Sequence, residues 1–325
     1  MNASAGLTGD LISLDAVRAA AARIAPHVAA TPLVALIPTG LRLKAESLHP
    51  IGAFKLRGAF NAILSLSDAE RARGVIAYSS GNHAQAVSYA AHKLGVRAVI
   101  VMPDNAPRAK LAGTRRWGAE VVVVGPASAE RAARAQALTA EHGYILIPPF
   151  DARAIMEGTG TIGLEILDAA GDVDTVFAPV SGGGLLGGLA AAIKQLNPAV
   201  RVVGVEPELA DDAAQSLRAG RIVTLSAEEA SRTIADGLRV QQLGDLTWPH
   251  IRQFVDEIIT VSEAEIRSAV RTIAAGAKLV AEPSGAVAAA GALKQGGDLG
   301  RSVAVLSGGN VDLDLLAEIL GEASA

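Results

Sequence analysis

Six apolar runs rich in valine and isoleucine recur along the chain, and alanine-rich stretches of helical length separate most of them. The runs span 74–79, 97–103, 120–125, 175–180, 200–206 and 302–307. Short, continuously apolar runs are typical of strands buried on both faces of a parallel sheet, and the stretches between them are expected to be crossover helices. The alternation therefore predicts an α/β fold, in which ligands bind at the carboxyl ends of the strands.

The composition suits such a core and excludes several classes of function. Half of the residues are apolar and mean hydropathy is +0.34, yet no stretch approaches the ~20 uninterrupted apolar residues that cross a bilayer. The N-terminal segment also lacks the basic and apolar regions of a signal peptide. A net charge of −4 gives no basic surface for nucleic acid. The sequence has no cysteine, which excludes disulfides, thiolate metal sites and a cysteine nucleophile, and suits a cytoplasmic protein.

The segment IGAFKLRGAF (51–60) places Lys55 among apolar residues, directly before an expected helix. An amine in apolar surroundings loses its charge more easily, which a lysine that binds a carbonyl cofactor covalently requires. The alternative is a solvated surface lysine whose aliphatic stem covers apolar neighbours.

A second motif, SSGNHAQ (79–85), follows the first of the strand-like runs. Its polar residues Ser79, Ser80, Asn82 and His83 lie where a strand ends and a helix begins. The unpaired backbone N–H groups at such a position attract anions, including carboxylates. A simple helix cap by Ser80 or Asn82 is the alternative.

A third motif, SGGGLLGG (181–188), also lies between a strand and a helix. Glycines allow successive N–H groups to point into one concavity, which binds phosphate. Gly182, Gly184 and Gly187 also fit the G-x-G-x-x-G pattern of dinucleotide-binding folds, and Glu206 ends the next strand near the expected ribose-binding position. The loop by itself is compatible with either cofactor class.

Two further segments follow later strands. EPELADD (206–212) brings together Glu206, Asp211 and Asp212, whose oxygens suit a hard cation such as Mg²⁺ or Ca²⁺, although an acidic helix start has the same pattern. LSGGNVD (306–312) contains Ser307, which can hydrogen-bond a heteroaromatic nitrogen, and two glycines that allow a flat ring to approach. A tight turn is the alternative there.

Together, and in this order, the five segments resemble the serine/threonine dehydratase and serine racemase family of fold-type II pyridoxal-phosphate (PLP) enzymes. The likeness runs from Thr31 to Asp312. It implies two open, twisted, mostly parallel sheets flanked by helices, the tryptophan synthase β-like fold. It also implies a large PLP-binding domain over 1–66 and 150–325, a small domain over 70–146, and a cofactor between them.

The resemblance implies a role for each segment. Lys55 would carry PLP covalently and act as the base at the substrate α-carbon, and Ser80 would face it across the cofactor. The other implied PLP contacts are Phe54, Asn82 at the 3-hydroxyl, Ser307 at the pyridine nitrogen, and Gly182, Gly183, Gly184 and Leu185 at the phosphate. The substrate carboxylate would be held by Ser79, Ser80, Asn82 and His83, with help from Arg131. The residues implied for a divalent cation (Mg²⁺, Mn²⁺ or Ca²⁺) are Glu206, the Ala210 carbonyl and Asp212.

The expected activity is that of an ammonia-lyase that converts L-threonine or L-serine to an α-keto acid and ammonia. Serine racemase and threo-3-hydroxyaspartate dehydratase are the near alternatives, and a nicotinamide-dependent oxidoreductase is the distant one. Val240 replaces a serine found near the racemase substrate, which disfavours a pure racemase. Pro50 replaces a lysine of the nucleotide site in mammalian serine racemase, which disfavours activation by ATP. The resemblance also implies a homodimer.

Overall fold

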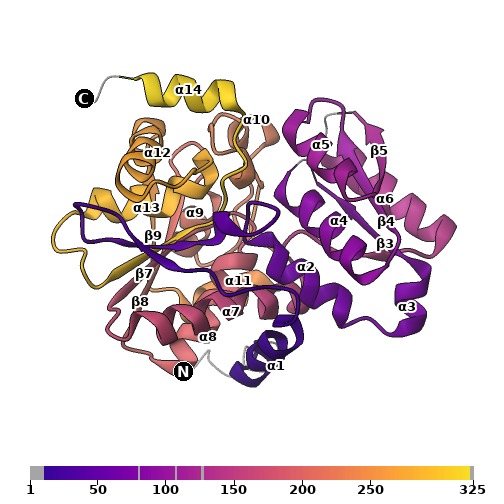
Figure 1. The fold of residues 1–325 in the computed structure, drawn as a ribbon, viewed down its shortest axis with the longest axis horizontal. Coiled ribbons are helices and arrows are strands. Elements are labelled where there is room, and N and C mark those ends of the chain that lie inside the picture. The colour runs from indigo at the N-terminus through magenta and orange to yellow at the C-terminus, as the bar shows by residue number, and fades with distance from the viewer. Residues whose placement is uncertain (1–10, 80, 107, 126–127, 323–325) are drawn as a thin grey trace.

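The larger of two β-sheets is built from strands that lie far apart in the sequence (Figure 1). The computed structural model describes residues 11–79, 81–106, 108–125 and 128–322. The sheet order is β1-β2-β10-β7-β8-β9, and only β1 runs antiparallel to its neighbour. The strands are β1 Leu33–Ala35, β2 Arg42–Ala45, β7 Thr175–Pro179, β8 Arg201–Pro207, β9 Glu257–Val261 and β10 Ser302–Leu306.

The second sheet is smaller, and its four strands are all parallel in the order β5-β4-β3-β6. They are β3 Val75–Tyr78, β4 Ala98–Pro103, β5 Glu120–Val124 and β6 Ile145–Leu146. We call this sheet with helices α3–α6 the smaller lobe, and the six-stranded sheet with α1, α7–α9 and α11–α14 the larger lobe. The division into domains at 66–70 and 146–150 stays a prediction.

Helices between successive strands form crossovers, as the alternating pattern predicted, whereas α1 precedes the first strand and α14 follows the last. Those before β7 are α1 Leu14–Ile24, α2 Lys55–Leu64, α3 Asp68–Arg73, α4 Asn82–Leu94, α5 Arg108–Arg116, α6 Ser128–His142 and α7 Arg153–Ala170. Those after it are α8 Gly184–Leu196, α9 Asp212–Ala219, α10 Ala227–Ala230, α11 Thr247–Phe254, α12 Glu263–Ala277, α13 Pro283–Gln295 and α14 Leu313–Gly321. Two short 3₁₀ turns, η1 Glu46–Leu48 and η2 Asp236–Leu238, complete the described elements.

All six predicted strands are present, within one residue of the expected bounds at each end. No strand was expected at β1, β2 or β9. The first two have three and four residues, which is too short for a periodic pattern to be recognised. The third, β9, is half-buried along most of its length, so it lacks the continuous apolar character of the central strands.

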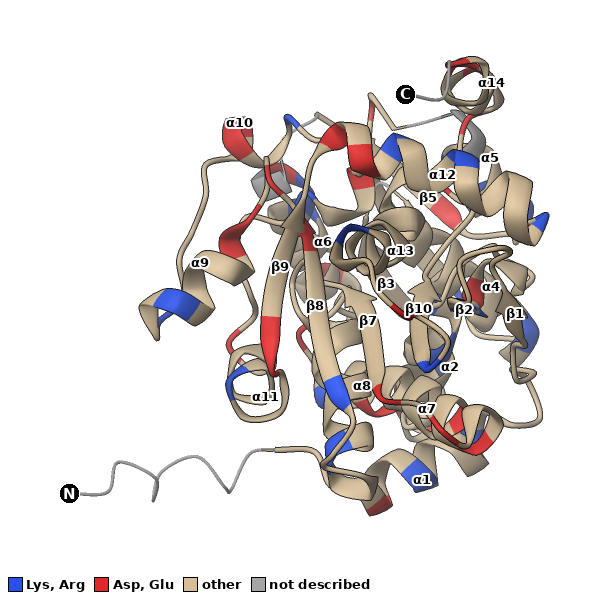
Figure 2. Cartoon of the chain, turned by 90° about the vertical axis from the view of Figure 1, so that its left-hand side faces the viewer, with Lys and Arg blue, Asp and Glu red and all other residues tan. Residues whose placement is uncertain are grey.

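Two small-residue helices cover opposite faces of the larger sheet. Helix α13 packs across β10, β7 and β8, and α8 packs with α7 on the other face. The approach is close, since a Cβ at Gly291 of α13 would lie 2.7 Å from Val205 of β8. In Figure 2, β7, β8 and β9 carry charge only near their ends, which fits a sheet buried between two helical layers. Within residues 11–79, 81–106, 108–125 and 128–322, no helix is long and apolar enough to cross a membrane.

Candidate active site

The carboxyl ends of several strands present the predicted motifs. Ser79 follows β3 of the smaller sheet, whereas Ser181 and Ser307 follow β7 and β10 of the larger sheet. The Phe54 N–H donates to the Ser307 carbonyl at 3.0 Å, which holds the start of α2 against the end of β10. Lys55 is the first residue of α2, so the predicted covalent lysine and the predicted pyridine-binding serine are brought together.

The Lys55 amine is held inside the molecule. Its Nζ donates to the Pro149 carbonyl at 2.6 Å and lies 5.1 Å from the centroid of the Phe54 ring. Burial lowers the pKa of Lys55 to about 8, because the charged form loses its hydration there. About a tenth of the amine is therefore uncharged at pH 7, far more than for an ordinary lysine, and the uncharged form is the nucleophile toward a carbonyl.

The glycine-rich loop forms the N-terminus of α8 and packs tightly on its surroundings. A Cβ at Gly182 would lie 2.5 Å from the Phe150 ring, and Gly183 has a φ of 91°. The first N–H groups of a helix have no intrahelical partner, and here they belong to residues 184–186. The buried Ser181 hydroxyl beside them also has no hydrogen-bond partner among the described atoms. This set of unused donors suits a phosphate.

His83, near the N-terminus of α4, is neutral and fully enclosed. Its Nε2 lies 2.9 Å from the Ile147 carbonyl, which requires the hydrogen to be on Nε2. Burial and the charge of Lys55 lower the pKa of the imidazole to about 3. The Nδ1 atom is then an acceptor, so the imidazole cannot donate to a carboxylate from that side. The backbone N–H groups of Asn82 and His83, in the first turn of α4, are the donors that suit an anion.

Asn82 is held at both ends of its side chain by the larger lobe. Its Nδ2 donates to Glu282 Oε1 at 2.5 Å, and its Oδ1 accepts from Asn310 Nδ2 at 2.8 Å. Asn310 also donates to the Ile51 carbonyl. An amide nitrogen carries two hydrogens, so one remains for a phenolic oxygen of a cofactor. The predicted contact to the 3-hydroxyl is compatible with this geometry.

The remaining predicted substrate residues lie in the smaller lobe or outside the described residues. Ser79 accepts a hydrogen bond from the Gly81 N–H at 3.2 Å through its hydroxyl. Arg131 is half-buried on α6, where burial lowers the pKa of its guanidinium. Ser80 lies outside the described residues. The roles of these three residues stay predictions.

The predicted cation ligands include two buried carboxylates. Glu206, at the end of β8, accepts from the N–H groups of Ala213 and Ala214 at 3.1 and 2.8 Å. Both carboxylate oxygens of Asp212 are buried without a hydrogen-bond partner among the described atoms. Burial raises the pKa of Asp212 to about 7 and raises that of Glu206 as well, and the two charges repel each other. A buried carboxylate without hydrogen-bond partners, beside a second buried carboxylate, suits the binding of a cation.

Asp211 does not join Glu206 and Asp212 at the candidate cation site, although the spacing of the acidic motif suggested that it would. Asp211 turns toward α9, where it accepts from Gln215 at 2.6 Å and pairs with Arg218. Among the residues with described positions, no three acidic or histidine side chains converge on a possible metal ion. The candidate cation ligands are therefore the carboxylates of Glu206 and Asp212. The predicted third ligand is the backbone carbonyl of Ala210, which is also buried.

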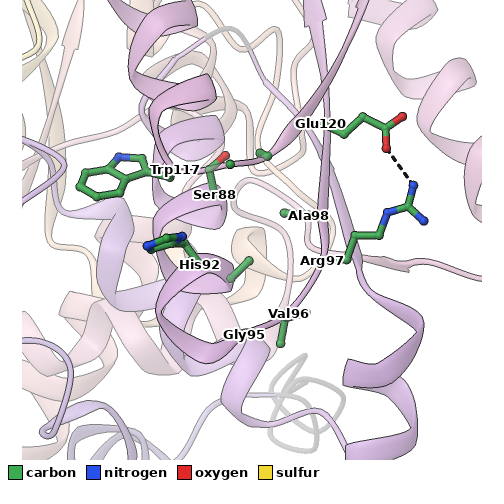
Figure 3. Close-up of a pocket in the computed structure, with 11 residues that line it drawn as sticks. Ser88, His92, Gly95, Val96, Arg97, Ala98, Trp117 and Glu120 are labelled. Carbon is green, nitrogen blue, oxygen red and sulfur yellow. Dashed lines mark hydrogen bonds and ion pairs between the residues drawn. The ribbon is translucent and has the colours of Figure 1, made fainter.

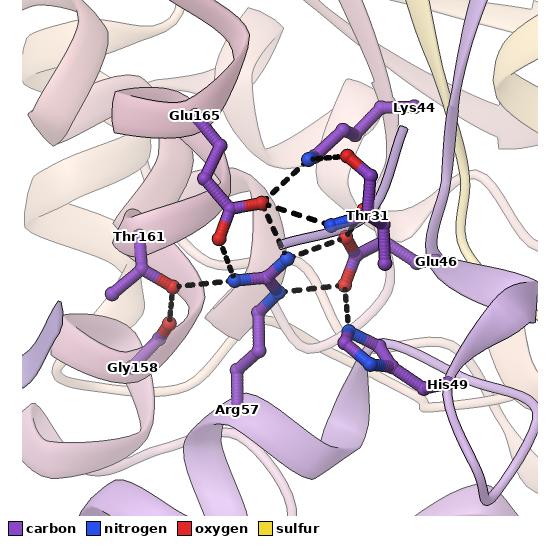
Figure 4. A network of polar contacts seen from close by, with 8 residues as sticks. All are labelled: Thr31, Lys44, Glu46, His49, Arg57, Gly158, Thr161 and Glu165. Carbon is purple, nitrogen blue, oxygen red and sulfur yellow. Dashed lines mark hydrogen bonds and ion pairs between the residues drawn. The ribbon is translucent and has the colours of Figure 1, made fainter. Parts of the chain in front are cut away.

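A buried ionic network behind Lys55 anchors helix α2 (Figure 4). The Arg57 guanidinium binds Glu46 through Nε and Nη2 at 2.7 and 2.8 Å, and binds Glu165 through Nη1 and Nη2 at 2.6 and 2.8 Å. Lys44 adds a second cation on Glu165 at 2.5 Å. Burial raises the pKa of Glu46, but the Arg57 charge and the hydrogen bonds outweigh this and hold it well below its usual range. The network joins α2 to β2 and α7.

A separate hollow of about 390 Å³ lies in the smaller lobe (Figure 3). Ser88, His92, Trp117 and an Arg97–Glu120 ion pair line it. It opens where β4 and β5 begin, at the edge opposite to the carboxyl ends that carry the predicted motifs. Ligands of α/β sheets bind at the carboxyl ends, so this hollow is not the candidate site.

Several residues of the site were not found by the sequence reading. Phe150 lies under the glycine-rich loop, and the Thr247 hydroxyl donates to the Gly182 carbonyl at 2.6 Å. Asp151 accepts from three successive N–H groups, at 245–247, and so positions Thr247. Glu282 and Asn310 hold Asn82. None belongs to a glycine-rich or strand-end motif except Asn310, which lies in the LSGGNVD segment.

Comparison with known proteins places this site in a family. A family model described as "Pyridoxal-phosphate dependent enzyme" matches residues 24–308. The chain is 42% identical to serine racemase from Oryza sativa subsp. indica over 96% of this chain and 95% of that protein. It is also 42% identical to L-threo-3-hydroxyaspartate ammonia-lyase from Saccharomyces cerevisiae, over 92% and 93% of the two chains.

A solved structure shares the arrangement of both lobes. The threonine deaminase of T.th. matches with a TM-score of 0.87 and 46% identity, over 93% of this chain and 99% of that chain. The family model spans the glycine-rich loop, which leaves the dinucleotide interpretation of that loop without support. These similarities agree with the geometry of the site, which has a lysine at the start of α2 and unused donors at the start of α8. The chain belongs to the family of pyridoxal-phosphate-dependent enzymes.

Proposed function

We propose that the protein is an ammonia-lyase that converts L-threonine or L-serine to an α-keto acid and ammonia, by loss of water followed by hydrolysis, with PLP bound at Lys55. The observation that carries the proposal is the half-buried Lys55, whose amine pKa is lowered to about 8 by loss of hydration, at the start of α2 where the Phe54 N–H binds the Ser307 carbonyl. The relatives act on small hydroxy amino acids, as the names serine racemase, threonine deaminase and hydroxyaspartate ammonia-lyase state. PLP supplies a conjugated ring that withdraws electrons from the substrate α-carbon.

The protein's own groups would orient the substrate and move its protons. Lys55, uncharged in part near neutral pH, would take the α-proton through Nζ. Ser307 would donate a hydrogen bond to the ring nitrogen without protonating it, because a hydroxyl is a poor acid. Ser307, by leaving that nitrogen uncharged, would moderate the electron withdrawal that the cofactor supplies. Loss of the β-hydroxyl as water would also require a proton. The backbone N–H groups at the start of α4 would hold the substrate carboxylate, with Ser79, Ser80 and Arg131 beside them.

Two near alternatives are racemisation of serine and dehydration of threo-3-hydroxyaspartate, and named relatives support both. A substrate panel separates the three activities. We expect the PLP-loaded protein to release keto acid from threonine and serine faster than from hydroxyaspartate, with little D-serine in the residual serine. The proposal fails if none of the three is consumed, or if Lys55→Ala retains the wild-type rate.

We also propose that a divalent cation (Mg²⁺, Mn²⁺ or Ca²⁺) binds between Glu206 and Asp212, with the Ala210 carbonyl as a third ligand. The support is the pair of buried Asp212 oxygens, which have no hydrogen-bond partner among the described residues, and the repulsion between the two carboxylates. Hard cations prefer carboxylate and carbonyl oxygens. Bound there, the cation would brace the end of β8 against α9 and would not take part in the reaction.

A homodimer is the proposed assembly. Ile37, Leu48, Val280 and Leu313 each expose more than half of their surface. Gly309 lies between two of these segments, because a Cβ there would lie 2.7 Å from the Val280 carbonyl and 3.3 Å from Ser47. Leu48 follows Ser47, so Leu48 and Val280 lie on either side of Gly309. We expect light scattering to give a dimer for the wild type and a monomer for Leu313→Asp. The absence of cysteine supports a cytoplasmic location, which cell fractionation would test.

A further inference from the structure

Lys110 is a buried lysine that connects the two lobes. It lies on α5 of the smaller lobe and is 4% exposed. Its Nζ contacts Asp236 Oδ2 at 2.5 Å and Glu282 Oε2 at 3.4 Å, and both carboxylates belong to segments packed on the larger sheet. An ammonium taken out of water needs such partners, because an unpaired buried charge is strongly unfavourable.

The two carboxylates are themselves fixed in the larger lobe. Asp236 begins η2, and its Oδ1 lies 3.4 Å from the Ser284 hydroxyl, which accepts from the Gly237 N–H at 2.8 Å. Glu282 is the residue directly before α13, and its N–H donates to the Gly308 carbonyl at 3.1 Å. Both carboxylates are therefore anchored beside α13, and Glu282 also adjoins the residue that follows Ser307.

The same lysine touches the proposed substrate-binding turn. A Cβ at Gly81 would lie 3.3 Å from Lys110 Cδ and 3.5 Å from its Nζ. Glu282, its second partner, accepts from Asn82 at 2.5 Å through its other oxygen. Lys110 thus contacts the turn before α4 directly, and it contacts Asn82 through Glu282.

We propose that Lys110 is a positioning residue that holds the smaller lobe against the larger lobe. In this arrangement the proposed substrate-binding turn before α4 faces the residues that bind the cofactor. The inference rests on the proposed function for its effect on catalysis. Lys110 has no assigned contact with substrate or cofactor. Its removal would loosen the turn before α4 and weaken substrate capture, while the cofactor contacts of the larger lobe stay in place.

The test compares Lys110→Met and Lys110→Arg with a matched control. Lys194→Met removes a lysine that pairs with Asp256 at 2.7 Å within the larger lobe. We expect Lys110→Met to raise KM for threonine at least tenfold with a smaller change in kcat. The near-visible absorbance of bound cofactor should stay at the wild-type level. Lys110→Arg should recover most of the loss, and Lys194→Met should leave KM unchanged.

Hydrogen exchange on the cofactor-free protein gives a second readout that does not depend on activity. We expect faster exchange in Lys110→Met over 81–85 and 108–116, with no change in β10.

If Lys110→Met does not fold, Asp236→Asn replaces it, because that side chain is one-third exposed and more tolerant of substitution. Unchanged exchange together with an unchanged KM would overturn the proposal, as would a lower melting temperature as the sole effect. A wild type inactive on the whole panel would refute the proposed function, and the exchange comparison would still decide the lobe contact.

Discussion

The backbone N–H of Phe54 binds the carbonyl of Ser307 at 3.0 Å, although the two residues are far apart in the sequence. This bond joins the start of α2 to the end of β10 and is continued by a bridge between Ala53 and Gly308. The geometry of Lys55 relative to Ser307 therefore depends on backbone groups, which substitutions of neighbouring side chains leave intact. Replacement of Lys55 can thus be interpreted as a chemical change.

We expect Lys55→Ala to abolish keto-acid release and to remove the near-visible absorbance of the PLP-loaded protein. The reason is that alanine has no amine to bind the cofactor aldehyde or to take the α-proton. Absorbance spectra and borohydride trapping followed by mass spectrometry measure both effects. Lys93→Ala, on the exposed side of α4, is the control and should keep the wild-type spectrum. Borohydride labelling at any other lysine would contradict the assignment.

Replacement of Arg57 should destabilise the protein far more than loss of a surface ion pair. Arg57→Met leaves Glu46 buried without its main partner, and breaking a buried pair in this way costs about 3–5 kcal/mol of unfolding free energy. Denaturant unfolding measures the change. Arg97→Met, which breaks an exposed pair with Glu120, should have little effect. Equal losses in the two variants would show that the network in Figure 4 does not anchor α2.

A methyl group at Gly183 should weaken cofactor binding as well as stability. The residue has a φ of 91°, and its Cβ would lie 2.7 Å from the Thr247 hydroxyl oxygen. We expect Gly183→Ala to cost about 1–2 kcal/mol from backbone strain and to raise the dissociation constant for PLP. Gly118→Ala is the control, because Gly118 has a φ of 76° but open space around it. That variant should lose stability without losing affinity for PLP, as fluorescence titration would show.

The stability of the cofactor-free protein should fall with rising pH where Glu282 ionises. Burial raises the pKa of Glu282 to about 7, although the neighbouring Lys110 charge lowers it, and Asp236 raises it further. The folded state therefore holds a proton that the unfolded state has lost above the ordinary pKa of 4.5. Unfolding free energy should decrease between these two values, by at most about 3 kcal/mol.

Glu282→Gln isolates this contribution, since glutamine cannot ionise. The difference in unfolding free energy between the wild type and Glu282→Gln should shift in favour of the variant as pH rises through the window. Denaturant titrations at several pH values between 4.5 and 7 measure it. Parallel pH profiles for the two proteins would mean that Glu282 titrates at its ordinary pKa in the folded state.

Removal of divalent cations should lower the melting temperature. A cation that binds only the folded state at about 100 times its Kd adds about 2.7 kcal/mol of unfolding free energy. Prolonged chelation should reverse this, and Mg²⁺, Mn²⁺ or Ca²⁺ should restore it. Asp212→Asn should no longer respond to cations, whereas Asp211→Asn, whose side chain binds Gln215, should respond like the wild type. No response in the wild type would leave the acidic motif as a helix start.

Much of the fold and several site residues could be predicted from local patterns. The strands β3, β4, β5, β7, β8 and β10 are continuous apolar runs, and such runs are recognised without knowledge of their partners. The motifs at Lys55, at Asn82 and at 182–185 follow strands or begin helices, so their backbone surroundings are also local. Their order along the chain indicated the family, which the comparisons confirm.

Other features were decided by tertiary structure alone. Short edge strands such as β1 form because a neighbour is present, and their own sequence is too short to show a period. Phe150 under the glycine-rich loop, and Lys110 between Asp236 and Glu282, occur in segments with no distinctive pattern. Their significance comes from burial beside distant residues, which changes the free energy of a charge far more than its sequence neighbours do.

The sequence by itself determined the strand–helix alternation and the motifs at strand ends, because both depend on local backbone geometry. The tertiary structure decided which charges are buried and paired, because those contacts join residues that are remote along the chain.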